Sequence, residues 1–303
     1  MIIDRFDKKK KDNTPIALAL GFFDSLHKGH ADVITRAISF ARANNCINAV
    51  FTFDNNPFGA LNKNVKLVYT FSERCELLKG MGADLIIAAD FSTSFLGISA
   101  PVFLKSLIGR FNVKYISCGP DYAFGNNAAG TTSLLAEFCS KNKIVLEIVD
   151  EAKINGEKIS SRRIRELIAA GEIETANSLL SMPFCIFGTV TVGRGVGNKL
   201  TFPTANIKPS NDKVVLGEGV YATNTYIGGK KYPSVTNAGA KPTFNDGSYG
   251  IETYIIDYNS PLYGQYIKVE FVKKIREVFS FSSIYRLKQQ ISVDIEARRS
   301  LLL

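Results

Sequence analysis

Residues 21–30 read Gly-Phe-Phe-Asp-Ser-Leu-His-Lys-Gly-His, and they join the apolar run Ile16–Leu20 to a segment with helical periodicity. The apolar face of that segment comprises Val33, Ile34, Ala37, Ile38 and Ala41. A short, continuously apolar run is typical of a strand buried on both faces, whereas the following spacing is that of one helix face. The junction therefore predicts a strand, a tight turn and a helix, which is the beginning of an α/β fold.

The same alternation continues to about residue 150. Further candidate strands are Ile47–Phe53, Leu85–Ala89, Lys114–Cys118 and Ile144–Val149. Candidate helices lie between them near Ser72–Met81, Ala100–Phe111 and Thr131–Lys141. Buried strands that are separated by helices predict a doubly wound parallel sheet.

The pattern changes after residue 185. Runs rich in Val, Thr and Tyr alternate with Gly, Pro and Asn, namely Phe187–Val192, Val220–Ile227, Gly250–Asp257 and Ile267–Lys273. Such runs predict a small antiparallel β-barrel. A helix is expected over Ser283–Leu303, and the segment Ser160–Ser181 also looks helical. At 303 residues two domains are expected, and we place their boundary between residues 183 and 184.

Composition narrows the functional classes. Lys and Arg exceed Asp and Glu by 37 to 28, a net charge of +9 that favours phosphate-bearing partners, and the run Lys8 to Lys11 is read as a solvated tail. There is neither a long apolar span nor a secretory signal, so we expect a cytoplasmic protein with no membrane contact. The cysteines are far apart and are read as small buried hydrophobes, not as a zinc or disulfide framework: Cys46, Cys75, Cys118, Cys139 and Cys185.

The only two histidines, His27 and His30, both lie in the first strand-to-helix turn. In a doubly wound sheet this turn lies at the carboxyl end of the strands, where ligands bind and a helix N-terminus attracts phosphate. Gly29 allows a nucleotide to approach the backbone, and the imidazoles can donate hydrogen bonds to phosphate oxygens. The alternative is that the two histidines are unrelated in function and are close in sequence by chance.

The block resembles the GxFDGxHxGH signature of the nucleotidyltransferase superfamily, in the version found in bacterial FAD synthetases, the bifunctional riboflavin kinase/FMN adenylyltransferases. Residues 160–165 stand where that family has SSTxIR, and residues 119–125 resemble its GxDFRFG motif. The resemblance implies that His27 and His30 stabilise the transition state of adenylyl transfer. It implies ATP-binding roles for Gly21, Phe23, Asp24, Gly29, Ser160, Ser161 and Arg165, and flavin-binding roles for Asp121 and Phe124. Ser25, Ala123 and Arg162 depart from the motifs, and one hypothesis is that Arg162 supplies the charge missing at Ala123.

A second set of motifs lies in the expected barrel. The glycine-rich stretch 188–197 would be weak by itself, but Pro203-Thr204-Ala205-Asn206 follows it and resembles the PTAN motif of riboflavin kinases. The resemblance implies that Thr204 and Asn206 bind Mg²⁺ on ATP, whose other contacts would come from Gly193, Gly197 and Lys199. Asn198 and Thr201 depart from the family pattern.

Later residues follow the kinase pattern in order. Ile251-Glu252-Thr253-Tyr254 falls where the family has its catalytic glutamate, although from pattern alone Glu252 could simply face solvent. Residues 237–244 resemble the family's NIGxxPTF loop, and Arg276 is expected at the flavin. The resemblance thus implies an adenylyltransferase domain over 1–183 and a riboflavin kinase barrel over 184–303.

The expected function is FAD biosynthesis, in which ATP phosphorylates riboflavin to FMN and then adenylylates FMN to FAD. Small molecules are the expected partners, without nucleic acid or membrane, and the sequence carries no signal for an oligomeric state. One alternative is the same family with only one activity retained. Others are a nucleic-acid-binding or regulatory protein, suggested by the charge, and a cytidylyl- or pantetheine-type nucleotidyltransferase sharing only the first domain.

Overall fold

The computed structural model describes residues 1–7, 11–61, 63–191, 202, 204–240 and 249–301. The chain divides into two compact units, Met1–Ser161 and Arg162–Leu303. The helical segment that follows residue 161 therefore packs with the second unit, while the expected boundary between functional domains after residue 183 stays a prediction. Among the described residues, no helix combines the length and apolarity that crossing a membrane requires.

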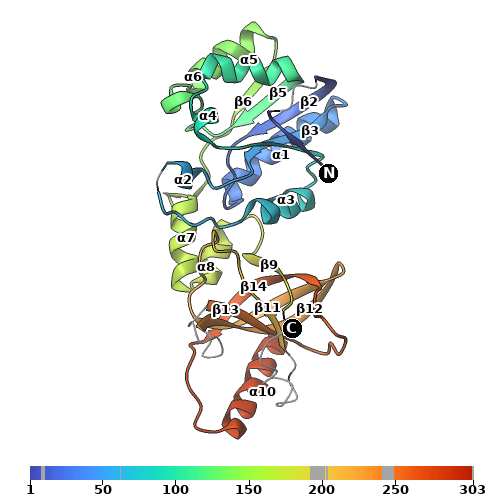
Figure 1. Cartoon of the computed structure of the whole chain (residues 1–303), viewed down its shortest axis with the longest axis vertical. Helices are drawn as coiled ribbons and strands as arrows, with labels where there is room; N and C mark the ends of the chain where they lie inside the picture. Colours follow the sequence, from blue (N-terminus) through green and yellow to red (C-terminus); the bar gives the residue numbers. More distant parts are fainter. Residues whose placement is uncertain (8–10, 62, 192–201, 203, 241–248, 302–303) are drawn as a thin grey trace. The chain divides into compact units, whose positions relative to one another are not determined.

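The first unit contains a six-stranded, wholly parallel sheet with the order β1-β4-β3-β2-β5-β6 (Figure 1). Its strands are β1 (Ile2–Arg5), β2 (Asp12–Leu20), β3 (Ile47–Phe53), β4 (Leu85–Ala89), β5 (Phe111–Cys118) and β6 (Val145–Ile148). Its helices are α1 (Lys28–Ala43), α2 (Pro57–Ala60), α3 (Phe71–Gly80), α4 (Thr93–Leu96), α5 (Ala100–Arg110), η1 (Asn126–Ala128) and α6 (Thr132–Lys141). A small hairpin, β7 (Lys153–Ile154) and β8 (Glu157–Lys158), completes the unit. The predicted doubly wound sheet is confirmed.

The alternation along β2 explains the two layers of helices. Ile16, Leu18 and Leu20 point to the face covered by α5 and α6, where they share one hydrophobic core with Phe103 and Leu107. The intervening small residues of β2 face α1, which packs against β2, β3 and β5. In Figure 1, α1 and α3 lie on the opposite side of the sheet from α5 and α6. Covering both faces with helices is what makes the strands continuously apolar.

The cysteines follow their predicted role. All five are free thiols. Cys75, Cys118, Cys139 and Cys185 are buried, and Cys46 is half-buried. Burial raises the pKa of the Cys75 thiol to about 11, which makes it a poor nucleophile at neutral pH.

The second unit begins with α7 (Ser161–Ala170) and α8 (Ile173–Leu179) and contains a curled, antiparallel, six-stranded sheet. Its order is β10-β13-β12-β11-β14-β9. The strands are β9 (Cys185–Thr189), β10 (Thr204–Ile207), β11 (Gly219–Ile227), β12 (Lys230–Ala240), β13 (Tyr249–Ile255) and β14 (Tyr266–Arg276). An isolated bridge between Thr191 and Asn206 brings the two edge strands together. The predicted antiparallel barrel is confirmed, although β10 and β12 were not expected as strands.

The C-terminal helix α10 (Ile284–Ser300) is held to the barrel by both apolar and polar contacts. Ile295 shares a small hydrophobic cluster with Val220 and Val235. Arg298 is buried and donates hydrogen bonds to the Thr223 carbonyl at 2.9 Å and to Asn224 Oδ1 at 2.6 Å. A buried guanidinium needs such acceptors, so this residue fixes where the helix docks.

Replacing Arg298 tests this docking. We expect Arg298→Met to lower the free energy of unfolding of the second unit by about 2 to 3 kcal/mol, because buried acceptors lose a charged donor. The matched control is Arg299→Met on the same helix, whose ion pairs are exposed and whose loss should cost less than about 0.5 kcal/mol. Urea unfolding of both variants measures the difference, and equal effects would contradict the docking role.

Candidate functional site

A cavity of about 960 Å³ lies in the first unit at the carboxyl end of the parallel strands. Its walls include residues 20–23 after β2 and 119–128 after β5. β2 lies between β3 and β5, so the chain leaves it toward one side of the sheet and returns on the other. Such a switch point is where open α/β sheets bind ligands.

The two histidines stack face to face in this cavity, with ring centroids 3.6 Å apart. His27 is the N-cap of α1, and its Nδ1 accepts the backbone N–H of His30 at 3.1 Å. Because Nδ1 is the acceptor, the proton of the neutral His27 ring lies on Nε2, which is then a donor. The predicted pairing of the two imidazoles is thus present as a defined local geometry.

Burial keeps both imidazoles neutral. It lowers the pKa of His27 from 6.5 to about 4. The pKa of His30 is lowered well below its usual value, first by burial and then by the positive potential of His27 and Arg74. The Nδ1 atom of His30 is buried and has no hydrogen-bond partner among the described residues. Neutral rings can donate hydrogen bonds without bringing an uncompensated charge into the site.

The turn before α1 is strained and tightly packed. Phe23 and Leu26 adopt left-handed backbone angles, with φ of 56° and 47°, which side chains other than glycine rarely tolerate. A Cβ atom on Gly29 would lie 3.1 Å from the Cβ of Ala152 and 3.3 Å from the His27 ring. Strain of this kind concentrates at ligand sites, and here it places Phe23 and Gly29 on the cavity wall.

A hydrogen bond joins the first motif to the second. Ser25 and Ser161 are 136 positions apart, and their hydroxyl oxygens lie 2.9 Å from each other. Ser160 and Ser161 both line the cavity together with Gly21. Ser25, a departure from the family motif, is therefore hydrogen-bonded to Ser161, which is one of the predicted ATP-binding residues.

Many residues that line the cavity are aromatic. We call the following set the aromatic wall: Phe22, Phe51, Phe53, Phe91, Phe95, Phe103, Tyr122 and Phe124. Its rings contact one another, as in the pair Phe53–Phe91 with centroids 4.7 Å apart and the pair Phe103–Phe124 at 5.6 Å. The cavity thus combines two histidines with an apolar aromatic wall. This combination suits two ligands that bring phosphate groups and a flat ring into one site.

Lys158 is a site residue that the sequence reasoning missed. It lies on β8, lines the cavity, and its Nζ is 3.0 Å from Asp121 Oδ2, and it also pairs with Glu151. The neighbouring Ala123 also lines this region. Arg162, which was suggested to compensate for Ala123, has its Nε 3.0 Å from Glu166 on its own helix. The available signal was the position of Lys158, two residues before Ser160.

Two predicted ATP-binding residues lie elsewhere. Asp24 is buried and accepts the backbone N–H of Val68 at 2.9 Å, and it is not among the cavity-lining residues. Its described contact is therefore with the protein backbone. Arg165 lies on α7 within the second unit, and its role stays a prediction.

A second cluster lies on the barrel. Asn206 on β10, Glu252 on β13 and Asn237 on β12 are direct neighbours across three adjacent strands. The Thr204 hydroxyl donates to Glu252 Oε1 at 2.8 Å, and Thr204 and Asn206 share one face because they are two residues apart on a strand. The structure thus brings the predicted Thr204, Asn206 and Glu252 together. Asn237 joins them, and the motif at 237–244 could have identified it.

Of the remaining residues predicted for the kinase site, the structure describes Arg276. Arg276 donates to Asp294 from Nε at 3.0 Å and from Nη2 at 2.8 Å, and its guanidinium lies 4.6 Å from the Phe279 ring centroid. It therefore ties β14 to α10, and flavin binding by Arg276 stays a prediction. The predicted residues Gly193, Gly197 and Lys199, and the departures Asn198 and Thr201, lie outside the described residues.

Comparisons with known proteins cover both parts of the chain. A family model described as FAD synthetase matches residues 9–163, and one described as riboflavin kinase matches residues 180–302. Curated proteins named bifunctional riboflavin kinase/FMN adenylyltransferase are similar over nearly the whole chain. The relative from Buchnera aphidicola is 35% identical, covering 95% of this chain and 94% of its own, and that from Listeria monocytogenes is 32% identical, covering 93% and 91%.

Among solved structures, a crystal structure described as a macrolide-efflux protein from Streptococcus pneumoniae has the same overall architecture. It is 30% identical, covers 96% of this chain and 95% of its own, and has a TM-score of 0.82. The likeness extends over both units.

The depressed histidine pKa values make a direct prediction. Between pH 6.5 and about 4 the unfolded chain binds protons at His27 that the folded chain does not, so stability should fall as the pH decreases through this window. Because there are only two histidines, their NMR signals are assigned simply, and both should titrate below the usual value of 6.5, His27 at about 4. A titration midpoint near 6.5 for either ring would contradict the buried, neutral pair.

Proposed function

The chain belongs to the bifunctional riboflavin kinase/FMN adenylyltransferases, and we propose which of its residues perform the two reactions. It is a transferase that phosphorylates riboflavin to FMN and adenylylates FMN to FAD, with ATP as the donor in both steps. The observation that carries the first assignment is a single cavity lined both by the paired neutral imidazoles and by the aromatic wall. No efflux function is carried over from the solved relative.

In the first unit we assign the histidine-lined part of the cavity to ATP and the aromatic wall to the flavin ring of FMN. A volume of about 960 Å³ is at the upper end of the range for a single ligand, as expected of a site that holds two substrates. The Ser160 and Ser161 side chains and the start of α7 suit the phosphates of ATP. Asp121 and Lys158 lie where the ring side meets the phosphate side.

Adenylyl transfer then requires alignment more than acid–base chemistry. An oxygen of the FMN phosphate attacks the α-phosphorus of ATP, and the bond to the β-phosphate oxygen breaks to release pyrophosphate. Negative charge grows on the pyrophosphate, and the Nε2–H of His27 and the ring of His30 can donate hydrogen bonds to it. The Lys158 ammonium supplies the positive charge on the FMN side that Ala123 lacks.

In the second unit we assign the catalytic base to Glu252. The ribityl hydroxyl of riboflavin attacks the γ-phosphorus of ATP, its proton passes to the Glu252 carboxylate, and ADP leaves. Thr204 holds this carboxylate in place through its 2.8 Å hydrogen bond, while Asn206 and Asn237 flank it on the adjacent strands. The hydroxyl, the amides and the carboxylate thus face one substrate.

The barrel cluster fits Mg²⁺, which we propose as the cofactor of the kinase reaction. Thr204 and Asn206 offer neutral oxygen atoms on one strand face, and hard oxygen ligands are what Mg²⁺ prefers. Within the described residues no three His, Cys, Asp or Glu side chains gather as a metal cage, so the ion would share its ligands with ATP phosphates. When bound, the ion neutralises charge on those phosphates.

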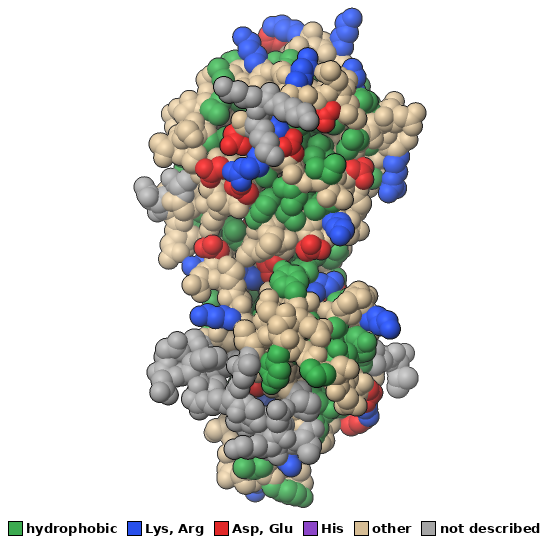
Figure 2. Space-filling view, turned by 45° about the vertical axis from the view of Figure 1, so that its right-hand side comes forward, with side chains coloured by type: hydrophobic (Ala, Val, Ile, Leu, Met, Phe, Trp, Pro, Cys, Tyr) green, Lys and Arg blue, Asp and Glu red, His purple; other side chains and the backbone are tan. Residues whose placement is uncertain are grey.

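The surface charge suits small phosphorylated substrates. On the face that Figure 2 shows, the described Lys and Arg side chains are scattered among Asp and Glu and do not form one continuous stripe. Sequence-independent nucleic-acid binding would favour such a stripe. We infer that the partners are riboflavin, FMN, FAD and ATP, and that the protein acts in the cytoplasm.

The two assignments predict separable losses of activity. We expect His30→Ala to slow FAD formation from FMN by roughly 100-fold or more, since one transition-state donor is lost, and to leave riboflavin phosphorylation within about twofold. Glu252→Gln should do the reverse, slowing FMN formation by roughly 100-fold or more. Chromatography of riboflavin, FMN and FAD follows both steps, and loss of both activities in either variant would contradict the assignment.

The metal assignment predicts a contrast at one position. Thr204→Val removes the hydroxyl at nearly constant volume and should raise the Mg²⁺ concentration needed for half-maximal kinase activity by roughly tenfold. Thr204→Ser keeps the hydroxyl and is the matched control. A magnesium titration of both variants checks this, and an unchanged requirement in Thr204→Val would contradict a ligand role.

A further inference from the structure

Phe6 lies directly after β1 and contacts residues of the aromatic wall without lining the cavity itself. Its ring centroid is 5.3 Å from that of Phe51, 5.6 Å from Phe103 and 6.2 Å from Phe95. The backbone N–H of Phe6 continues the β1 ladder by donating to the Ala88 carbonyl at 2.8 Å. One side chain therefore connects an edge strand to three rings of the wall.

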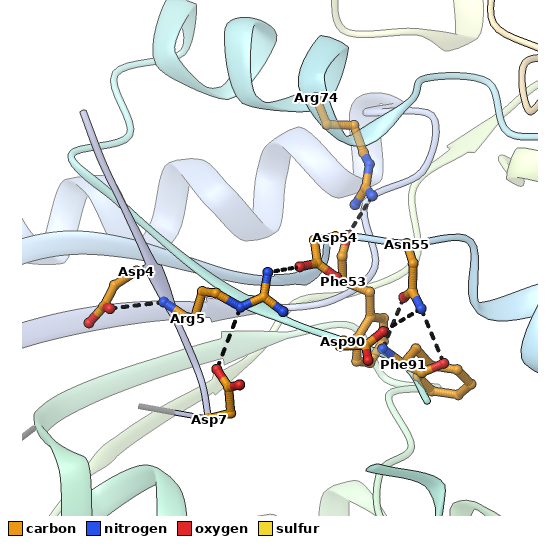
Figure 3. Close-up of polar contacts among 9 residues, drawn as sticks. All are labelled: Asp4, Arg5, Asp7, Phe53, Asp54, Asn55, Arg74, Asp90 and Phe91. Carbon is orange, nitrogen blue, oxygen red and sulfur yellow. Dashed lines mark hydrogen bonds and ion pairs between the residues drawn. The ribbon is translucent and has the colours of Figure 1, made fainter. Parts of the chain in front are cut away.

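Ion pairs fix the end of β1 that carries Phe6. Arg5 Nη1 lies 2.6 Å from Asp54 Oδ2 and its Nε 3.6 Å from Asp7, as Figure 3 shows. Arg110 on α5 is 2.5 Å from Asp4 and also donates to the Arg5 carbonyl. These contacts all lie at the carboxyl end of the strand, on the side of the sheet where the cavity is.

Asn55 extends the same support to the next loop. Its amide donates to Asp90 at 2.6 Å and accepts the backbone N–H of Phe91 at 2.9 Å (Figure 3). Arg74 donates to the Phe53 carbonyl at 2.7 Å. Phe53, the last residue of β3, and Phe91, which follows β4, are therefore held by side chains outside the cavity.

The rest of β1 offers little hydrophobic anchoring. Ile2 and Ile3 are 67% and 49% exposed, so the strand buries little apolar surface of its own. The Arg5–Asp54 pair is exposed at Arg5 but mostly buried at Asp54, and buried Arg110 adds a contact to Asp4, so polar contacts do more than the two isoleucine side chains to hold the strand. The aromatic contacts of Phe6 add to the β1–β4 pairing and to the contacts of Arg110, and the partners of Phe6 are cavity residues.

We propose that Phe6 is a positioning residue for the flavin, and that β1 with its Arg5–Asp54 pair serves to hold Phe6 against the aromatic wall. The proposal rests on the proposed location of FMN at that wall. Phe6 touches no substrate and acts by keeping Phe51, Phe95 and Phe103 in a geometry that matches a flat ring. Its loss should weaken FMN binding and leave the phosphate side of the cavity intact.

The test uses the full chain and compares steady-state constants for both substrates. We expect Phe6→Ala to raise the KM for FMN in FAD formation about threefold to tenfold, as the loss of aromatic contacts implies, with the KM for ATP within about twofold of the native value. Phe6→Leu should restore part of the FMN affinity. Riboflavin phosphorylation, measured in the same preparation, should be unchanged.

Ile2→Ala is the matched control, since it changes an exposed side chain on the same strand. A native KM for FMN in Phe6→Ala, or an equal rise in both KM values, would overturn the proposal. If Phe6→Ala has lost all FAD formation, Phe6→Leu and Asp54→Asn are judged by the same criteria. Phe95→Ala alters the wall itself, so an unchanged KM for FMN in that variant contradicts the proposed flavin site. If the KM for FMN rises in Phe95→Ala but keeps its native value in Phe6→Ala, only the role of Phe6 is contradicted.

Discussion

The hydrogen bond from the backbone N–H of His30 to Nδ1 of His27 couples the fold of the first unit to its chemistry. It caps α1, so it determines where the helix begins after β2. It also decides the tautomer, because an Nδ1 that accepts leaves the proton of a neutral ring on Nε2. A Cβ on Gly29 would press on the His27 ring and on Ala152, so glycine here leaves room for the stacked rings. The geometry of the two imidazoles is thus a product of how one helix starts.

Local patterns in the sequence were sufficient for the sheet, the barrel and the two clusters, while contacts between distant residues were not. The apolar runs predicted β2 to β6, and the motif at 203–206 singled out Thr204 and Asn206, which the structure places beside Glu252. β1 was missed because Ile2–Arg5 is short and its anchoring depends on Asp54 and Arg110, far along the chain. β10 was read only as a motif, since four residues are too few for a periodic pattern.

The departures from the family motifs are explained by partners that no local pattern can reveal. Ser25 replaces a glycine, and its hydroxyl meets that of Ser161, which joins the two motifs on the ATP side. Ala123 removes a cation, and Lys158 stands on the same wall with its ammonium 3.0 Å from Asp121. Two of the departures thus have described neighbours that could offset them, a hydroxyl for Ser25 and an ammonium for Ala123.

Both proposed sites must accommodate the negative charge of a triphosphate, and the two units offer different chemical groups for this purpose. In the first unit the proposed phosphate site presents N–H donors such as the imidazole of His27, and such groups bind phosphate oxygens directly. In the second unit the proposed kinase site is built around the Glu252 carboxylate, with Thr204 and Asn206 beside it. A carboxylate repels a triphosphate, and the proposed Mg²⁺ would offset that repulsion. The difference follows from the parent structures, because a helix N-terminus exposes donors whereas the strands of a sheet use their N–H groups on one another.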